Sequence, residues 1–183
     1  MSFSKYLNDN YEKIKGTHTH TRIGDKTDKI SGGTYSITNE EEFMTKYYDH
    51  VFVKGNKEYL TEKQFKEDAP IVIDVDMRYS TGITTRQHTE NHVIDLIDMY
   101  FNHIAKVCDT PDAQKIEVFV MEKPKVNVLD TKTKDGVHII IGLSIHKDLQ
   151  VKLRQAALPN LKIVWEDLPL TNDIEDLIDA SFP

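Results

Sequence analysis

Ile71-Val72-Ile73-Asp74-Val75-Asp76-Met77-Arg78 is the stretch of sequence that indicates the fold most clearly. Its first three residues are apolar and mostly β-branched, which is typical of a buried strand. Because alternate side chains of a strand project to opposite faces, Asp74 and Asp76 share one face. Two neighbouring carboxylates repel each other, and a divalent cation bound by both is the usual remedy. The alternative is that Asp76 only ends the strand while Asp74 pairs with a lysine or an arginine.

The composition is that of an ordinary soluble globular protein, with 29% charged and 39% hydrophobic residues. A length of 183 residues suits one domain, or one domain with an annex. The net charge of −7 argues against a generally basic nucleic-acid-binding protein but allows a local basic groove. The single cysteine, Cys108, excludes an internal disulfide and fits a reducing intracellular setting. Neither a signal peptide nor a run of about 18 apolar residues is present, so no membrane partner is expected.

The polar N-terminal region contains two short patterns. Thr17-His18-Thr19-His20-Thr21-Arg22 alternates and predicts a solvated edge strand. In such a strand His18 and His20 share a face, and metal binding by them is a less favoured alternative. Contact of Arg22 with a phosphate or a DNA template is another alternative. The pair Gly32-Gly33 indicates a turn or a close backbone approach.

Capping-box patterns predict a helix over residues 38–49 and a short helix that begins at residue 61. The longest predicted helix ends at Asp109-Thr110-Pro111-Asp112. Near its start, His88 and His92 are four positions apart and could share a ligand. Structural or solvent-exposed roles are more common for such a pair, so we do not expect a metal there.

From residue 70 onward the predicted elements follow the order β-α-β-β-α-β. After the strand of Asp74 and Asp76, strands are expected at 116–121, 137–143 and 161–165, helices at 84–108 and 147–157, and a helix or arm at 173–179. This α+β order is that of ferredoxin-like and RNA-recognition-type (RRM-like) domains. Their first and third strands are antiparallel neighbours, so Asp74, Asp76 and His138 are expected on one sheet face, opposite the helices. Residues 1–69 would form an α/β annex packed against a catalytic core of residues 70–183.

A sheet face with two acids and one imidazole suits phosphoryl or nucleotidyl transfer, in which divalent metals bridge the attacking and leaving oxygens. The imidazole of His138 can contact a triphosphate. Lysines at 123–134 can gather phosphates at the rim, although a solvated turn is their more common role. Conventional RNA recognition is disfavoured because the third strand lacks the aromatic pattern that stacks bases.

Several separated motifs resemble one known family. Asp74-Val75-Asp76 and Gly136-Val137-His138 resemble motifs one and two of the archaeo-eukaryotic primase (AEP) superfamily. A closer resemblance is to the N-terminal primase domain of primase-helicases from nucleocytoplasmic large DNA viruses, of the giant virus and poxvirus type. It extends over residues 17–22, 32–33, 70–92, 135–142 and 165–172, which together span most of the chain.

The resemblance implies a metal-dependent DNA primase or primase-polymerase. Such a nucleotidyltransferase transfers a nucleotide from NTP or dNTP to a primer on a single-stranded DNA template in viral DNA replication, with pyrophosphate as the leaving group. The implied ligands of Mg²⁺ or Mn²⁺ are Asp74, Asp76 and a third acid, Asp179, with which Asp176 competes. Nucleotide binding would fall to His138, Arg78 and Lys134, and contact with nucleic acid to Arg22, Lys123, Lys125 and Lys132.

Such family members continue with a linker domain and a superfamily 3 helicase, whereas only four residues follow Asp179 here. We therefore expect a fragment whose core is cut short at its C-terminal end, from a protein that acts at a cytoplasmic viral replication site or in the virion. Two other functions stay open: a different two-metal enzyme such as a nuclease, and a non-catalytic nucleic-acid-binding module with a structural metal.

Overall fold

The structure is a computed structural model that describes residues 2–14, 16–63, 67–108 and 115–180. It divides into two compact units, Met1–Gln64 (unit 1) and Phe65–Pro183 (unit 2), each with its own hydrophobic core. The division falls five residues before the boundary expected from the sequence. Packing of the annex against the catalytic core stays a prediction. None of the described helices is long and apolar enough to cross a lipid bilayer.

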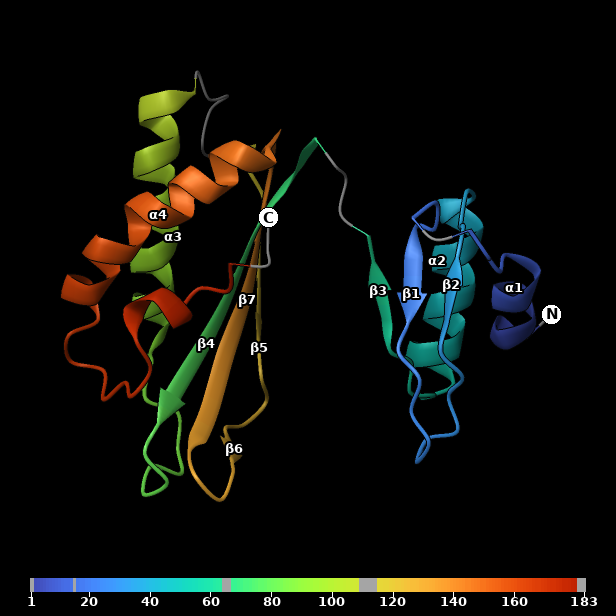
Figure 1. Ribbon diagram of the computed structural model, residues 1–183, viewed down its shortest axis with the longest axis horizontal. Helices are drawn as coiled ribbons and strands as arrows, with labels where there is room; N and C mark the ends of the chain where they lie inside the picture. The colour runs from blue at the N-terminus through green and yellow to red at the C-terminus, as the bar shows by residue number, and fades with distance from the viewer. Residues whose placement is uncertain (1, 15, 64–66, 109–114, 181–183) are drawn as a thin grey trace. The chain divides into compact units, whose positions relative to one another are not determined.

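Unit 1 is a small α/β unit (Figure 1). In chain order, its elements are α1 (Phe3–Asp9), β1 (His20–Arg22), β2 (Gly33–Tyr35), α2 (Glu40–Tyr48), the π-helical turn η1 (Asp49–Val53) and β3 (Leu60–Glu62). Its sheet has the order β2-β1-β3, and both pairings are antiparallel. The buried core comprises Phe3, Tyr6, Leu7, Tyr35, Ile37 and Phe43.

Two expectations for unit 1 are wrong. The strand predicted over residues 17–22 exists as β1, but it is the central strand of the sheet rather than an edge. The short helix predicted from residue 61 is instead β3, because Thr61 pairs with Thr21 of β1. Its capping-box pattern is local, whereas the pairing that decides the structure joins residues about forty positions apart. The ring of His20 packs against Phe43, with the ring centroids 4.8 Å apart.

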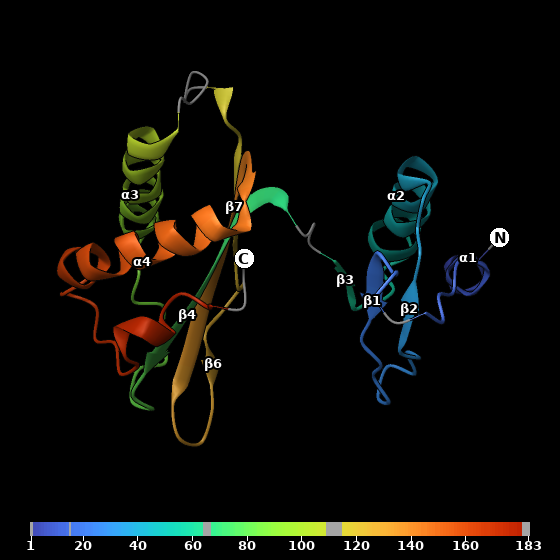
Figure 2. The same cartoon turned by 45° about the horizontal axis from the view of Figure 1, so that its top comes forward.

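Unit 2 contains one antiparallel sheet with two long helices on one side (Figures 1 and 2). In chain order, its elements are β4 (Asp68–Tyr79), α3 (Glu90–Val107), β5 (Val118–Glu122), β6 (Asn127–Val128), β7 (Thr133–His146), α4 (Lys147–Val164) and the 3₁₀ turn η3 (Ile174–Asp176). The sheet has the order β4-β7-β5, and β6 pairs with β7. The first and third long strands, β4 and β7, are thus antiparallel neighbours, which confirms the α+β arrangement.

The fourth strand of the predicted core, 161–165, is wrong. Helix α4 continues through Pro159 to Val164, and Leu161 is buried in the core as part of that helix. A short apolar run cannot be assigned to a strand or a helix from periodicity alone. Helix α3 also begins later than expected, at Glu90. The stop expected for it at 109–112 lies outside the described residues.

The place of the fourth strand, beside β4, is taken by the closing segment, residues 171–180. Ile178 forms an antiparallel bridge with Val75. The amide of Asp76 donates to the Leu177 carbonyl at 2.9 Å, and the amide of Asp179 donates to the Asp74 carbonyl at 2.8 Å. The closing segment therefore completes the β-α-β-β-α-β order with a few residues rather than with a full strand.

Candidate active site

The predicted acid and imidazole side chains meet on one face of the sheet. In the register of β4 and β7, Asp74 is opposite His138 and Asp76 is opposite Gly136. Opposed residues of antiparallel strands project to the same face, so Asp74, Asp76 and His138 lie together on adjacent central strands. Their neighbours Ile73, Val75 and Met77 are buried beneath α3 and α4. The expectation from strand order and alternation is therefore confirmed.

Each of the two acids on β4 has cationic or imidazole partners. His138 Nε2 lies 2.8 Å from Asp74 Oδ1. Asp76 Oδ2 lies 3.1 Å from Lys134 Nζ and 3.4 Å from Arg78 Nε. Arg78 and Lys134 are themselves opposed across the two strands. The three residues expected to bind a nucleotide therefore surround the acid pair.

The electrostatics of the face favour a bound cation at Asp74. Burial raises the pKa of the Asp74 carboxyl above its ordinary value, the imidazole of His138 opposes the rise, and the carboxylates of Asp179 and Asp76 add to it. A carboxylate that is half-buried beside two other acids is stabilised by any added positive charge. This is the environment in which a divalent ion binds carboxylate oxygens.

The third acid comes from the closing segment. Because Ile178 bridges Val75, Asp179 lies opposite Asp74 in the same register, and its charge acts on the pKa of Asp74. Asp176, the competing candidate, instead pairs with Arg78 at 3.2 Å. The geometry therefore favours Asp179 over Asp176 as the acid beside Asp74.

Two side chains hold the closing segment in place, Asn172 from within the segment and Arg154 from outside it. The side-chain amide of Asn172 donates to the Asp76 carbonyl at 2.9 Å and accepts from the Arg78 amide at 3.0 Å. From helix α4, Arg154 Nε donates to the Ile178 carbonyl at 2.9 Å. Asn172 is the last residue of the stretch 165–172, one of those that resemble the viral primase domains. It attaches the closing segment to the strand that carries the acids.

Lys123 belongs to this face, and Gly136 makes room for it. A Cβ atom added at Gly136 would lie 2.8 Å from the Val75 carbonyl oxygen and 3.2 Å from Lys123 Nζ. The charge of Lys123 also lowers the pKa of Asp74. Glycine in the first position of the Gly-Val-His motif thus lets the lysine ammonium reach across the strand toward the acids.

The other expected contacts with nucleic acid are placed differently. Lys125 is exposed and Lys132 is half-buried in the connection between β5 and β7, and contact with phosphates through them stays a prediction. Arg22 of unit 1 is buried, with Nε and Nη2 each 2.7 Å from an oxygen of the buried Glu58 carboxylate. Arg22 therefore has a structural ion pair with Glu58, and its contact with a template stays a prediction.

Metal binding by the acids requires more than the protein side chains alone. Within the described residues, no group of three or more histidine, cysteine, aspartate or glutamate side chains is close enough to hold a metal by itself. The oxygen ligands nevertheless suit Mg²⁺ or Mn²⁺, because such ions commonly use only one or two carboxylates and complete their coordination with substrate phosphates. The residues fit a metal that arrives together with a nucleotide.

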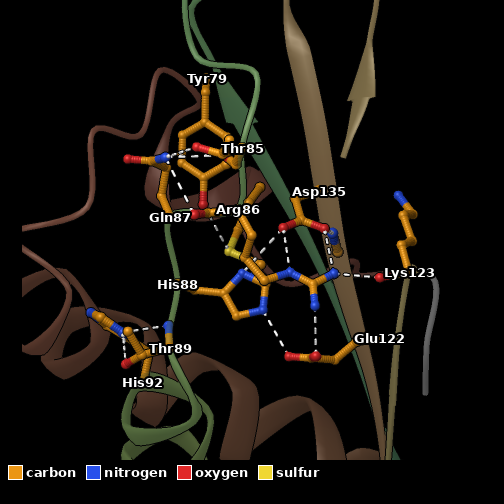
Figure 3. Close-up of polar contacts among 12 residues, drawn as sticks. Tyr79, Thr85, Arg86, Gln87, His88, Thr89, His92, Glu122, Lys123 and Asp135 are labelled. Carbon is orange, nitrogen blue, oxygen red and sulfur yellow. Dashed lines mark hydrogen bonds and ion pairs between the residues drawn. The ribbon is translucent and has the colours of Figure 1, made fainter. Parts of the chain in front are cut away.

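A second polar cluster, which the sequence did not reveal, lies on the helix side of the same strands (Figure 3). The guanidinium of Arg86 lies between Asp135 and Glu122, with its Nε 3.1 Å from Asp135 Oδ2 and its Nη1 2.7 Å from Glu122 Oε2. It also donates to the backbone carbonyl of Lys123. Asp135 is fully buried, and its Oδ1 accepts from the Gly136 amide at 2.9 Å. The cluster therefore fixes the backbone on which Lys123 and Gly136 are placed.

His88 and His92 contact different side chains. His88 is buried, and its Nε2 lies 2.9 Å from Glu122 Oε1. Its Nδ1 lies 3.3 Å from Asp135 Oδ2 but is too poorly aligned for a hydrogen bond. His92 Nδ1 instead accepts from the Thr89 amide at the start of α3, and His92 Nε2 lies 3.2 Å from Asp167 Oδ1. Both imidazoles thus contact acidic side chains of unit 2.

Removal of the guanidinium from the second polar cluster is expected to destabilise unit 2. Arg86→Leu leaves the buried Asp135 carboxylate without its cation, which should cost about 2–3 kcal/mol because Arg86 is only partly exposed. Urea unfolding followed by the fluorescence of Trp165, the single and buried tryptophan, measures the change. Lys125→Ala, an exposed loop substitution, is the control and should change stability by less than about 0.5 kcal/mol. Equal stabilities of the two variants would contradict the structural role.

An antiparallel sheet with two helices on one face, and with three acids, an imidazole and lysines on the other, defines the class of domain as α+β. The family model described as the C962R protein N-terminal AEP domain matches residues 19–183. The chain therefore belongs to this AEP domain family, and the resemblance seen in the sequence is confirmed.

A relative from a large DNA virus is consistent with this membership. The chain is 26% identical over 152 residues to a protein of Acanthamoeba polyphaga mimivirus that bears the name "Putative helicase L207/L206". The similar region covers 80% of this chain but only 16% of the mimivirus protein. The chain thus corresponds to a small part of that relative's length.

Proposed function

We propose that this chain is a metal-dependent DNA primase or primase-polymerase domain that acts in viral DNA replication. It would transfer a nucleotide from NTP or dNTP to a primer on a single-stranded DNA template. The observation that carries the proposal is the meeting of Asp74, Asp76 and Asp179 on the face that also bears His138 and Lys123. Membership of the AEP domain family supports the same chemistry.

The ion pairs of the site explain how it would receive a nucleotide and a metal together. Lys134 and Arg78 now neutralise Asp76. A triphosphate offers these two cations new partners, while Mg²⁺ or Mn²⁺ would neutralise Asp74, Asp76 and Asp179. Bound there, the metal would supply positive charge to the reacting phosphate oxygens. Metal and nucleotide should therefore bind cooperatively, each weakly without the other.

The proposed partners follow from the same assignment. They are a single-stranded DNA template, nucleoside triphosphates and a superfamily 3 helicase part of a longer polypeptide. The name of the mimivirus relative and its greater length support the last of these. The proposed setting is the site of viral DNA replication inside the infected cell.

A direct primer-synthesis assay tests the proposed function. The chain is incubated with a single-stranded DNA template, radiolabelled NTP or dNTP, and Mg²⁺ or Mn²⁺. We expect short labelled products that disappear when a chelator removes the metal. Shortening of an end-labelled template without synthesis would show a nuclease instead. Binding of the template with neither synthesis nor cleavage would show a non-catalytic module, and either result would overturn the proposal.

His138→Ala is expected to weaken nucleotide binding about ten- to a hundred-fold. The imidazole would donate one hydrogen bond to a phosphate, worth about 1.5–3 kcal/mol when the bond is charge-assisted. Because this contact is made in the ground state as well, the loss should appear mainly in the apparent KM for the nucleotide. His146→Ala, the same change eight positions along β7, should leave that KM unchanged. A loss confined to kcat in His138→Ala would show that His138 acts as a general acid or a metal ligand.

A further inference from the structure

The site face continues beyond the acids onto the edge strand β5. In the register of β5 and β7, Met121 is opposite His138 and Phe119 is opposite Ile140. Phe119 and Met121 therefore project to the same face as the acids. Phe119 is 55% exposed and Met121 is 49% exposed. Two large apolar side chains thus lie open to solvent next to the imidazole of the site.

The face is graded from apolar to cationic along its strands. One row across the sheet joins Val72, Ile140 and Phe119, since Ile140 is paired with both of the others. The next row joins Asp74, His138 and Met121. The row beyond these contains Asp76 and Gly136, with Lys123 beside Gly136, and past it lie the opposed residues Arg78 and Lys134.

A face that is apolar at one end and cationic at the other matches a nucleic-acid strand, which has flat bases and charged phosphates. Single exposed apolar residues are common and need no explanation. Here, however, the exposed ring of Phe119 belongs to a row whose other members are half-buried and apolar, and it lies about 13 Å along the strand direction from Lys123, at about 3.3 Å per residue. Proteins that bind single strands combine cations for the phosphates with aromatic rings on which bases stack.

We propose that Phe119 is a stacking platform for a base of a single DNA strand that crosses the open sheet face, with Met121 flanking it. This proposal rests on the proposed function and specifies where the strand contacts the domain. A copying enzyme must accept every template base in turn. An exposed ring suits that requirement, because stacking is tolerant of sequence whereas hydrogen bonds to base edges are not.

Binding of fluorescein-labelled oligo(dT) to the full chain, followed by anisotropy without nucleotide or metal, tests the proposal. Phe119→Ala should weaken binding about ten-fold, within the range of stacking contacts, and Phe119→Trp should restore it. Val120→Ala is the matched control, because Val120 is the neighbouring exposed residue on the opposite face. It should leave binding unchanged. Circular dichroism and Trp165 fluorescence confirm that each variant is folded.

Two further measurements identify the contact as stacking. The dependence of affinity on salt should be the same for Phe119→Ala as for the unchanged chain, because a stacked base releases no counterions. Lys123→Ala should instead make that dependence shallower. An oligonucleotide without bases should bind the unchanged chain and Phe119→Ala equally well.

Three results would overturn the stacking platform. In the first, the unchanged chain does not bind oligo(dT). In the second, Phe119→Ala binds oligo(dT) as tightly as the unchanged chain does. In the third, Phe119→Ala has a raised KM for nucleotide while its DNA affinity is unchanged. The last result would place the base of the incoming nucleotide on Phe119. The binding assay involves no synthesis, so the platform survives if Phe119→Ala weakens binding while the chain makes no primer. In that case only the proposed function fails.

Discussion

Asp74→Asn is expected to lower the rate of nucleotidyl transfer about a thousand-fold or more. The substitution keeps the shape of the side chain but removes the half-buried negative charge that would hold the metal. A metal clamp supplies several kcal/mol of transition-state stabilisation, and each 1.4 kcal/mol corresponds to about ten-fold in rate. Single-turnover extension of a labelled primer, with saturating nucleotide and metal, measures the effect. Asp68→Asn, an exposed change at the start of the same strand, should extend primer at the normal rate.

The stability of Asp74→Asn separates loss of chemistry from loss of structure. The pKa of Asp74 is raised in the folded chain, so the folded state keeps this proton at pH values at which the unfolded state has released it. The contribution of this carboxyl to stability therefore falls as the pH rises through the ordinary pKa towards the raised one. At neutral pH and without metal, Asp74→Asn should be as stable as the unchanged chain or slightly more so. If Asp74→Asn were inactive and also had a lower melting temperature than the unchanged chain, the loss of activity would reflect a structural role of Asp74.

Asp179→Asn is expected to reduce transfer about a hundred-fold or more, whereas Asp176→Asn should leave at least half of the activity. The two acids are three positions apart, but only Asp179 lies opposite Asp74, while Asp176 forms a pair with Arg78. Loss of the Asp179 charge should also bring the pKa of Asp74 down towards its ordinary value, which NMR titration of the carboxyl carbons can follow. If Asp176→Asn reduced transfer more than Asp179→Asn, the third acid of the site would be Asp176 rather than Asp179.

Much of unit 2 could be predicted because its signals are local and periodic. The apolar run before Asp74, the alternation that puts Asp76 beside it, and the strand of His138 all depend on a period of two. The order of these elements then places β4 beside β7 without any knowledge of contacts. That order predicts that Asp74 and His138 lie on one face of adjacent strands, which the structure confirms, and the structure adds the register that places them opposite each other.

The elements that were missed depend on contacts distant in sequence. The apolar residues at 161–165 fit a strand as well as a helix, and the packing of Leu161 in the core decides for the helix. The capping pattern at Thr61 is overridden by pairing with β1.

Side-chain partners were equally hidden from the sequence. Arg22 seemed available to a template because its partner Glu58 lies 36 positions away. Arg86 contacts Glu122 and Asp135, which are 36 and 49 positions away. No spacing rule connects such residues, because the sheet brings them together only after it has formed.

The closing segment has a consequence for the order in which the domain acquires its activity. The bond between Asn172 and Asp76 joins residues 96 positions apart, whereas β5 and β7 are close in the chain. Contacts between distant residues form against a larger loss of chain entropy, so local pairings tend to come first during folding. A newly made chain can therefore have its sheet before it has Asp179 beside Asp74. Until residues 171–180 have docked, unit 2 would be folded in outline but would lack Asp179 beside Asp74.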